Sequence, residues 1–139
     1  MSPTLVPELS VTDWRRSTAF YRDLIGFSIR YGREDEGFVY LELGSAELML
    51  DQIGIGRDFE TAERLAGPLG VGLNLQIEVP DVAAIAARLD AAGIELALPM
   101  EEKWYRTGER EAGQRQLVVA DPDGYLVRPV QSLGERAIG

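Results

Sequence analysis

The stretch Ala-Asp-Pro-Asp-Gly-Tyr-Leu-Val-Arg at residues 120–128 is the most informative short segment of this sequence. Asp121 can cap a turn, the proline after it presets φ, and Gly124 accepts a left-handed backbone at the exit. Apolar residues precede this turn at 117–119 and follow it at 125–127. The segment therefore predicts a β-hairpin that closes the C-terminal half of the chain.

The chain repeats one pattern of elements twice. Residues 9–13 and 77–81 each read as the end of an apolar strand followed by an Asp that can cap a helix. A helical stripe of apolar residues follows each Asp and stops at a glycine, Gly26 in one half and Gly93 in the other. Three strands then follow in each half, at 27–32, 37–43 and 46–52, and at 94–98, 114–120 and 125–131. This repetition indicates an internal duplication, and so an α+β chain of two tandem βαβββ modules.

The boundaries follow from the same pattern. We expect a single domain over residues 1–139, with a first module at about 4–52, a glycine-rich linker at about 53–70 and a second module at about 71–133. Residues 59–65 of the linker are weakly helical in pattern. A long polar loop is expected between Pro99 and Gly113, and it carries Trp104 and Tyr105.

Composition excludes several classes of protein. The 139 residues are 45% hydrophobic and 27% charged, as in ordinary globular proteins, and no apolar run is long enough to span a bilayer. The absence of a signal-peptide pattern and of cysteine favours the cytoplasm. With no histidine either, any metal would need an all-oxygen shell. The net charge of −9 argues against nucleic acid, and serves either solubility or the attraction of a cationic ligand.

Several motifs together resemble one known family. They are Val-Thr-Asp at 11–13, Phe-Tyr at 20–21, Leu-Ile-Gly-Phe at 24–27 and Asp-Pro-Asp-Gly-Tyr at 121–125. The doubled βαβββ pattern with this hairpin is similar to the vicinal oxygen chelate superfamily, which includes glyoxalase I, extradiol dioxygenases and the fosfomycin- and bleomycin-resistance proteins. Residues 103–134 resemble the bleomycin-resistance branch most. The resemblance implies curved mixed sheets around a cleft, and a homodimer in which each cleft draws on both subunits.

The resemblance also points to the positions that carry metal ligands in metal-dependent members. By their spacing to the shared motifs, these positions are Val6, Asp51, Asn74 and Arg128 here. Three of the four are not ordinary metal ligands, and the guanidinium of Arg128 would repel a divalent cation. We therefore expect no metal, no cofactor and no metal-dependent catalysis.

Strand alternation predicts what lines the cleft instead, because side chains at i and i+2 share one face of a sheet. Apolar positions such as Leu9, Val39, Leu50, Ile77 and Leu117 are expected to face the helices. The opposite face carries four acids against one arginine, with aromatic residues among them. It forms either the wall of a cleft or an open face in solvent. The expected ligand-binding residues are Glu8, Phe38, Tyr40, Glu42, Met49, Asp51, Asn74, Gln76, Trp104, Tyr105, Gln116 and Arg128.

An acidic, aromatic cleft suits a flat cationic molecule, because charge attracts it and aromatic faces stack on its rings. The sequence thus favours a binding protein that sequesters such a molecule without transforming it. A bleomycin-type glycopeptide antibiotic, with planar thiazole rings and a cationic tail, matches this chemistry, which would make the role drug resistance. Trp104 and Tyr105 either stack on the ligand or anchor their own loop.

Two alternatives stay open. One is a metal-independent enzyme in which Glu8 or Asp51 is a general base and Arg128 or Tyr40 stabilises an anion. The other is a small-molecule-binding protein unrelated to resistance.

Overall fold

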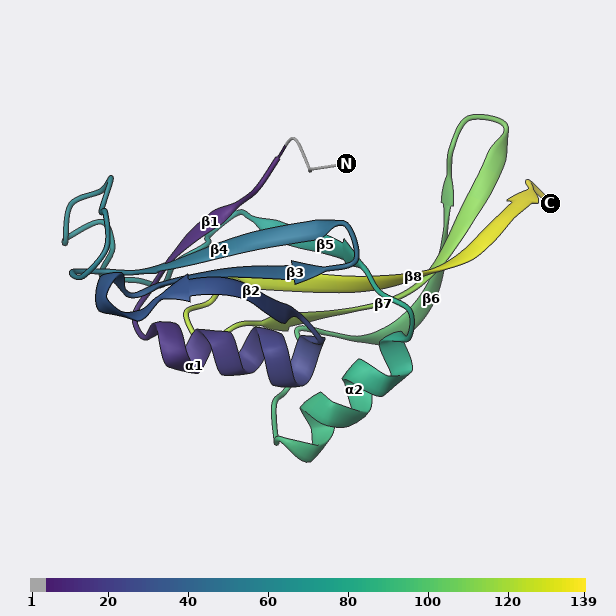
Figure 1. Ribbon diagram of the computed structural model, residues 1–139. Helices are drawn as coiled ribbons and strands as arrows, with labels where there is room; N and C mark the ends of the chain where they lie inside the picture. The colour runs from purple at the N-terminus through teal and green to yellow at the C-terminus, as the bar shows by residue number, and fades with distance from the viewer. Residues whose placement is uncertain (1–4) are drawn as a thin grey trace. The chain divides into compact units, whose positions relative to one another are not determined.

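The computed structural model describes residues 5–139, which divide into two compact units. The first unit contains the chain up to Leu73 together with the turn Asp121–Tyr125, and the second contains Asn74–Ala120 and Leu126–Gly139. Each unit has one four-stranded mixed sheet and one main helical segment (Figure 1). The predicted α+β class with two βαβββ modules is confirmed. Among the described residues, no helix is both long and apolar enough to cross a membrane.

The sheet of the first unit has the strand order β1-β4-β3-β2, with β1 parallel to β4 and the other pairs antiparallel. Its elements are β1 (Glu8–Val11), α1 (Trp14–Ala19), a π-helical continuation η1 (Phe20–Ile25), β2 (Ser28–Arg33), a short 3-10 turn η2 (Glu34–Glu36), β3 (Phe38–Leu43) and β4 (Ala46–Gln52). The strands lie within one residue of their predicted bounds.

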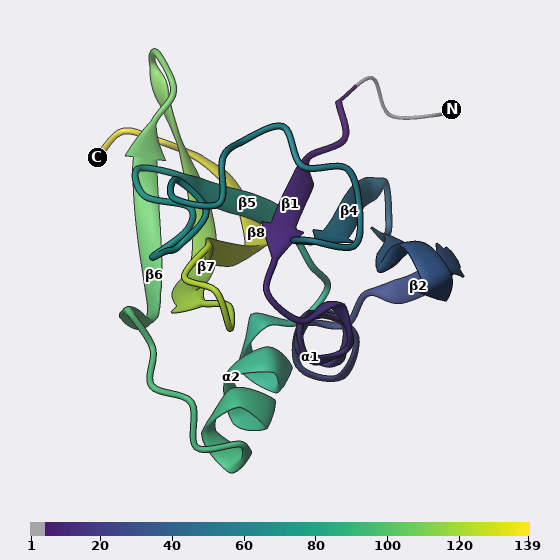
Figure 2. The same ribbon diagram turned by 90° about the vertical axis from the view of Figure 1, so that its left-hand side faces the viewer.

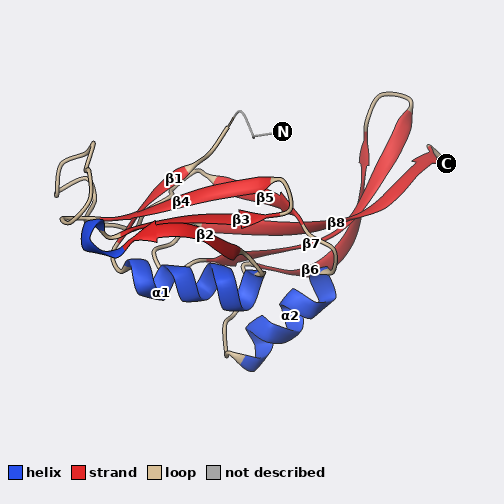
Figure 3. Ribbon diagram, viewed as in Figure 1, coloured by secondary structure: helices blue, strands red, loops and turns tan. Residues whose placement is uncertain are grey.

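Capping residues set the limits of the first helix. The Asp13 side chain accepts the backbone N–H groups of Arg15 and Arg16 at 3.0 and 3.3 Å, so two otherwise unpaired donors are satisfied. The helical segment ends at Gly26, whose φ of 113° is in the region that favours glycine. The segment packs along one face of the sheet, as Figure 3 and the end-on view of α1 in Figure 2 show.

The second unit repeats this plan with the strand order β5-β8-β7-β6. Its elements are β5 (Asn74–Glu78), α2 (Val82–Ala91), β6 (Leu98–Arg106), β7 (Arg110–Ala120) and β8 (Leu126–Ala137). The predicted cap Asp81 accepts the N–H of Ala84 at 3.1 Å, and α2 packs on β6, β7 and β8.

Four local predictions are wrong. Residues 99–113 are not a polar loop, because β6 and β7 pair through this region as a hairpin that extends past the end of β5 (Figure 1). The strand expected at 94–98 begins only at Leu98, and β8 continues to Ala137 rather than ending at 131. Residues 59–65 form turns, not a helix.

The core of each unit lies between its helix and one sheet face. Val11, Leu41 and Leu50 in the first unit, and Leu117 and Val119 in the second, are completely buried. These residues belong to the apolar set that the sequence assigns to the helix side. The other face of each sheet is therefore the one without a helix.

The Asp-Pro-Asp-Gly turn is part of the first unit. Asp121 accepts the N–H groups of Asp123 and Tyr125 at 2.9 and 3.0 Å, as expected for a capped turn. The hydroxyl of buried Tyr21 donates to Asp121 at 2.7 Å, and the hydroxyl of Thr12 donates to Asp123 at 2.6 Å. Burial raises the pKa of Asp121, although these hydrogen bonds oppose the shift. The turn thus anchors the start of the first helix.

Candidate functional site

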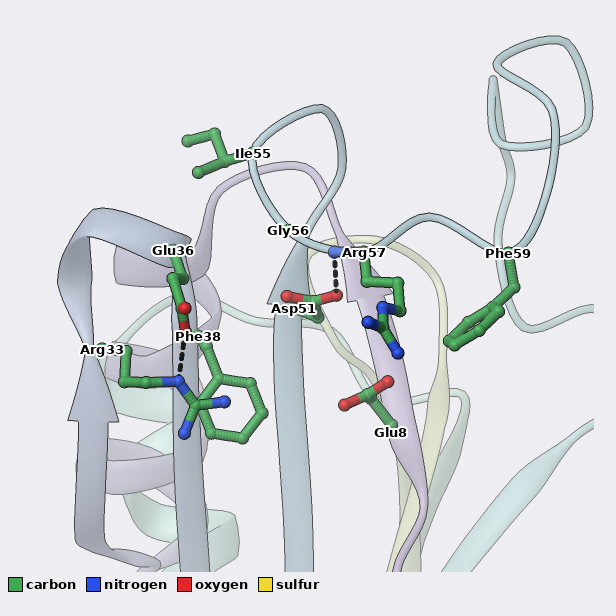
Figure 4. Close-up of a pocket in the computed structure, with 9 residues that line it drawn as sticks. All are labelled: Glu8, Arg33, Glu36, Phe38, Asp51, Ile55, Gly56, Arg57 and Phe59. Carbon is green, nitrogen blue, oxygen red and sulfur yellow. Dashed lines mark hydrogen bonds and ion pairs between the residues drawn. The ribbon is translucent and has the colours of Figure 1, made fainter.

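A pocket of about 550 Å³ opens on the helix-free face of the first sheet (Figure 4). Its wall is formed by Glu8 on β1, Arg33 at the end of β2, Glu36 in η2, Phe38 on β3, Asp51 on β4, and Ile55, Gly56, Arg57 and Phe59 in the segment after β4.

The alternation of side chains along the strands brings three predicted residues together in this pocket. Phe38 pairs in register with Asp51, and Glu8 pairs with Met49 on the same side of the sheet. The adjacent residues Leu9, Val39 and Leu50 belong to the opposite, helix-facing side and are buried. Glu8, Phe38 and Asp51 were predicted to share one face, and the structure places all three in the pocket.

The segment after β4 folds back over the end of its own strand. The carbonyl of Gln52 accepts the N–H groups of Ile55 and Gly56, and a carboxylate oxygen of Asp51 accepts the N–H of Arg57 at 3.0 Å. A Cβ at Gly56 would lie 1.9 Å from the other Asp51 carboxylate oxygen, so only glycine permits this approach. Asp51 therefore both lines the pocket and holds the loop that closes one side of it.

The two central carboxyl groups are perturbed in the same direction. Burial raises the pKa of Asp51, which is 8% exposed, although the hydrogen bond from the Arg57 backbone opposes the shift. Partial burial also raises the pKa of Glu8, and the nearby negative charge of Asp51 adds to the effect. Within residues 5–139, no group donates a hydrogen bond to the Glu8 carboxylate or forms an ion pair with it. An added cation would stabilise both ionised groups.

The pocket also contains two arginines that the sequence did not place there. Arg33 forms an ion pair with Glu36, and its guanidinium lies 4.1 Å from the ring centre of Phe38. The Arg57 side chain points into the pocket toward Glu8 (Figure 4). The wall of this pocket therefore has three carboxylates and two guanidinium groups, and the excess of acids expected over both sheets is smaller here.

The other predicted residues of the first sheet lie outside the pocket. The rings of Tyr40 and Tyr31 stack with centres 5.1 Å apart, and Arg30 lies over Tyr40 while pairing with buried Glu47 at 2.5 Å. Arg30 and Tyr31 were missed, and a bulge in β2 between Ile29 and Tyr31 shifts the alternation of the side chains there. Glu47 on β4 was missed as well. Glu42 and Met49 are half-buried, and neither they nor Tyr40 line the pocket.

Six predicted residues belong to the second unit, and Trp104 is one of them. Asn74 and Gln76 are exposed on β5, and Gln76 pairs in register with Arg128 on β8. Gln116 is 1% exposed and donates hydrogen bonds to Glu101 at 3.0 Å and to the hydroxyl of Tyr105 at 2.7 Å. The Nε of Arg128 is buried and has no hydrogen-bond partner among the described residues. None of these side chains lines the pocket of the first unit.

Trp104 packs within its own hairpin. A Cβ at Gly113, its cross-strand partner, would lie 2.6 Å from the indole, and the guanidinium of Arg136 lies 3.9 Å from the ring centre. Trp104 and Tyr105 are adjacent on β6 and therefore point to opposite faces. The contacts of Trp104 are thus those of a residue that packs against neighbouring strands. The hydroxyl of Tyr105, by contrast, accepts a hydrogen bond from Gln116.

The residues at the family's metal positions do not fit a metal ion. Val6 has no side-chain donor, and Arg128 brings a positive charge. Within residues 5–139, no three acidic side chains come close enough to share an ion. The Asp51 carboxylate is instead turned toward the backbone of its own loop.

Comparison with known proteins identifies the family of this chain. A model described as the Glyoxalase/Bleomycin resistance protein/Dioxygenase superfamily matches residues 5–128. No curated protein matches the sequence. A superfamily member from Vibrio splendidus is 37% identical, with 91% of this chain and 95% of that chain covered and a TM-score of 0.42.

Two further solved structures share the fold at lower identity. TioX from a Micromonospora species is 24% identical, with 95% of this chain and 100% of that chain covered and a TM-score of 0.70. A virulence protein from Salmonella typhimurium is 20% identical, with 94% and 97% covered and a TM-score of 0.67.

Proposed function

The chain belongs to the Glyoxalase/Bleomycin resistance protein/Dioxygenase superfamily, and on that premise we propose that it is a metal-independent binding protein that sequesters a cationic, aromatic-containing small molecule. The site is the pocket of the first unit. One observation carries the proposal: Glu8 and Asp51, both with raised pKa, lie in the same pocket as the rings of Phe38 and Phe59.

The physical argument combines charge and ring stacking. A partly desolvated carboxylate gains more from an ion pair than an exposed one does, because the surrounding medium screens the attraction less. Aromatic faces attract cations within about 6 Å of the ring centre. The stacking of Arg33 on Phe38 at 4.1 Å is an example of this contact inside the pocket itself.

The size of the pocket restricts the ligand. Pockets of about 300–1,000 Å³ suit drug-sized molecules, and this one is about 550 Å³. A bleomycin-type glycopeptide would place its cationic tail and thiazole rings there rather than its whole structure. Drug resistance would follow from sequestration, because a bound drug is withheld from its target without being changed.

Calorimetry and native mass spectrometry with a ligand panel test this function. The panel contains bleomycin with and without copper, small aromatic cations and their neutral isosteres. We expect Glu8→Gln and Asp51→Asn each to weaken cation binding by about 0.5–2 kcal/mol. Glu63→Gln is the matched control, because it removes the same charge from an exposed site outside the pocket. Binding that is equal in all variants, or that higher salt does not weaken, would contradict the proposal.

A metal-independent enzyme is the second candidate, and the raised pKa values of Glu8 and Asp51 favour it. A carboxyl group whose pKa lies above its usual range is a better proton acceptor near neutral pH. Turnover of a panel compound would identify an enzyme, whereas unchanged compound bound at one per site identifies sequestration. Absence of binding by the whole panel would favour a binding protein for another class of small molecule.

A further inference from the structure

The side chain of Arg57 is a cation that already lies in the pocket proposed to bind a cationic ligand. Its backbone is fixed, because its N–H donates to Asp51 at 3.0 Å. Its side chain is not fixed in this way, since it forms no ion pair or side-chain hydrogen bond among the described residues. The guanidinium points toward Glu8 (Figure 4), and its positive charge partly opposes the rise in the pKa of Glu8.

The other arginine of the pocket is held differently. Arg33 is tied to Glu36 by an ion pair and to Phe38 by stacking, so its charge is already compensated. Arg57 is exposed and extends from a loop rather than a strand. The positive charge of Arg57 can therefore leave the pocket without breaking an ion pair or a side-chain hydrogen bond, while that of Arg33 cannot.

We propose that Arg57 is a resident competitor: its guanidinium occupies the place beside Glu8 that the ligand takes, and the ligand group that displaces it is a planar amidinium or guanidinium ion. This inference rests on the proposed function. Two cations do not share one carboxylate without repulsion, so binding requires Arg57 to move out. A neutral molecule of the same shape gains no ion pair with Glu8 and does not displace the arginine.

The side chains that line the pocket favour a planar cation over a compact ammonium group. A guanidinium or amidinium ion presents its N–H groups in a fork that matches a carboxylate, and its flat face stacks on aromatic rings. Glu8 offers the carboxylate, and Phe38 and Phe59 offer the rings. Phe38 already accepts one guanidinium face, that of Arg33.

Benzamidine is the probe, with benzamide as its neutral isostere. Each is titrated by calorimetry into the wild-type protein, Arg57→Gln and Arg64→Gln. Arg57→Gln keeps the backbone N–H that Asp51 accepts, so the loop keeps its anchor. Arg64→Gln removes the same charge from an exposed residue outside the pocket that pairs with Glu60 at 3.1 Å. Thermal melting of each variant verifies that it is folded.

We expect Arg57→Gln to bind benzamidine about three- to tenfold more tightly than wild type, as for the removal of one competing, partly desolvated ion. Arg64→Gln should bind like wild type, and benzamide should gain nothing from either change. Benzamidine binding that is equal or weaker in Arg57→Gln would overturn the competitor role while the proposed function stands. If benzamidine binds no variant but other aromatic cations bind in a Glu8-dependent way, the amidinium class is wrong. If no aromatic cation binds any variant, both the inference and the proposed function are wrong.

Discussion

Replacing Gly56 by alanine tests whether the approach of the loop to Asp51 shapes the pocket. The added Cβ would lie 1.9 Å from one carboxylate oxygen of Asp51 and 2.4 Å from its carboxyl carbon. Contacts between a Cβ and such atoms are not found below 3.0 Å, so the loop or the carboxylate must move. A displacement of about 1 Å is enough to break the 3.0 Å hydrogen bond from Arg57 to Asp51.

The size of the effect follows from that lost bond. A hydrogen bond to a charged group contributes about 1.5–3 kcal/mol, and partial exposure of the loop favours the lower end. We therefore expect Gly56→Ala to lower the free energy of unfolding in urea by about 1–2 kcal/mol. Binding of aromatic cations should weaken as well, because the displaced segment carries the ring of Phe59 out of the pocket.

A double-mutant cycle isolates the cause. In an Asp51→Ala background the carboxylate that meets the new Cβ is gone, so Gly56→Ala should change stability by less than about 0.5 kcal/mol. The same loss in both backgrounds would show that the cost arises elsewhere in the loop. No loss in the wild-type background would refute the close approach altogether.

Further outcomes follow from other parts of the structure. Tyr21→Phe should lower the free energy of unfolding by about 1.5–3 kcal/mol, because a carboxylate oxygen of buried Asp121 loses its 2.7 Å donor; a loss below about 0.5 kcal/mol would contradict this. The folded-state pKa values of Glu8 and Asp51 are raised, so cation affinity should fall with decreasing pH while the solution is still above the usual carboxyl range; affinity that is constant down to that range would argue against it. Their ionisation should also make the folded state less stable as pH rises through the same interval. Elemental analysis should find no stoichiometric zinc, nickel, iron or manganese, and chelators should leave the melting temperature unchanged, since the family resemblance places a valine and an arginine at positions expected to hold metal ligands. Light scattering should report a homodimer at micromolar concentration, because the edge strand β2 exposes large apolar side chains; a monomer would refute it.

Local sequence signals were enough to predict most of the fold. Asp13 and Asp81 cap the helices that were expected to follow them, and β4 has its predicted bounds. These elements carry regular apolar alternation or helical stripes between clear turn residues. The same alternation correctly assigned Glu8 and Asp51 to one face, since parity in a strand is fixed once its neighbours are buried.

The structural features that were not predicted from the sequence lie in segments without such periodicity. β6 has no buried residue and is exposed over most of its length, so no apolar face marked it as a strand. Arg57 and Phe59 reach the pocket from an irregular segment whose path depends on the hydrogen bond to Asp51. Arg33 stands at the end of β2, one residue beyond the predicted strand. No turn signal in the sequence marks Gly56, so its close approach to Asp51 could not be predicted.

The Asp121–Tyr125 turn makes the first unit discontinuous in sequence. Tyr21 and Thr12 donate hydrogen bonds to this turn, and the hydroxyl of Tyr125 donates to the carbonyl of Ser10 at 2.9 Å. A fragment ending at Leu73 would keep a complete sheet but leave these groups without their partners. If the halves arose by duplication, they no longer fold as independent copies, because the first unit uses a turn from the second half of the sequence. Removing or exchanging either half would therefore break the hydrogen bonds that hold the start of the first helix.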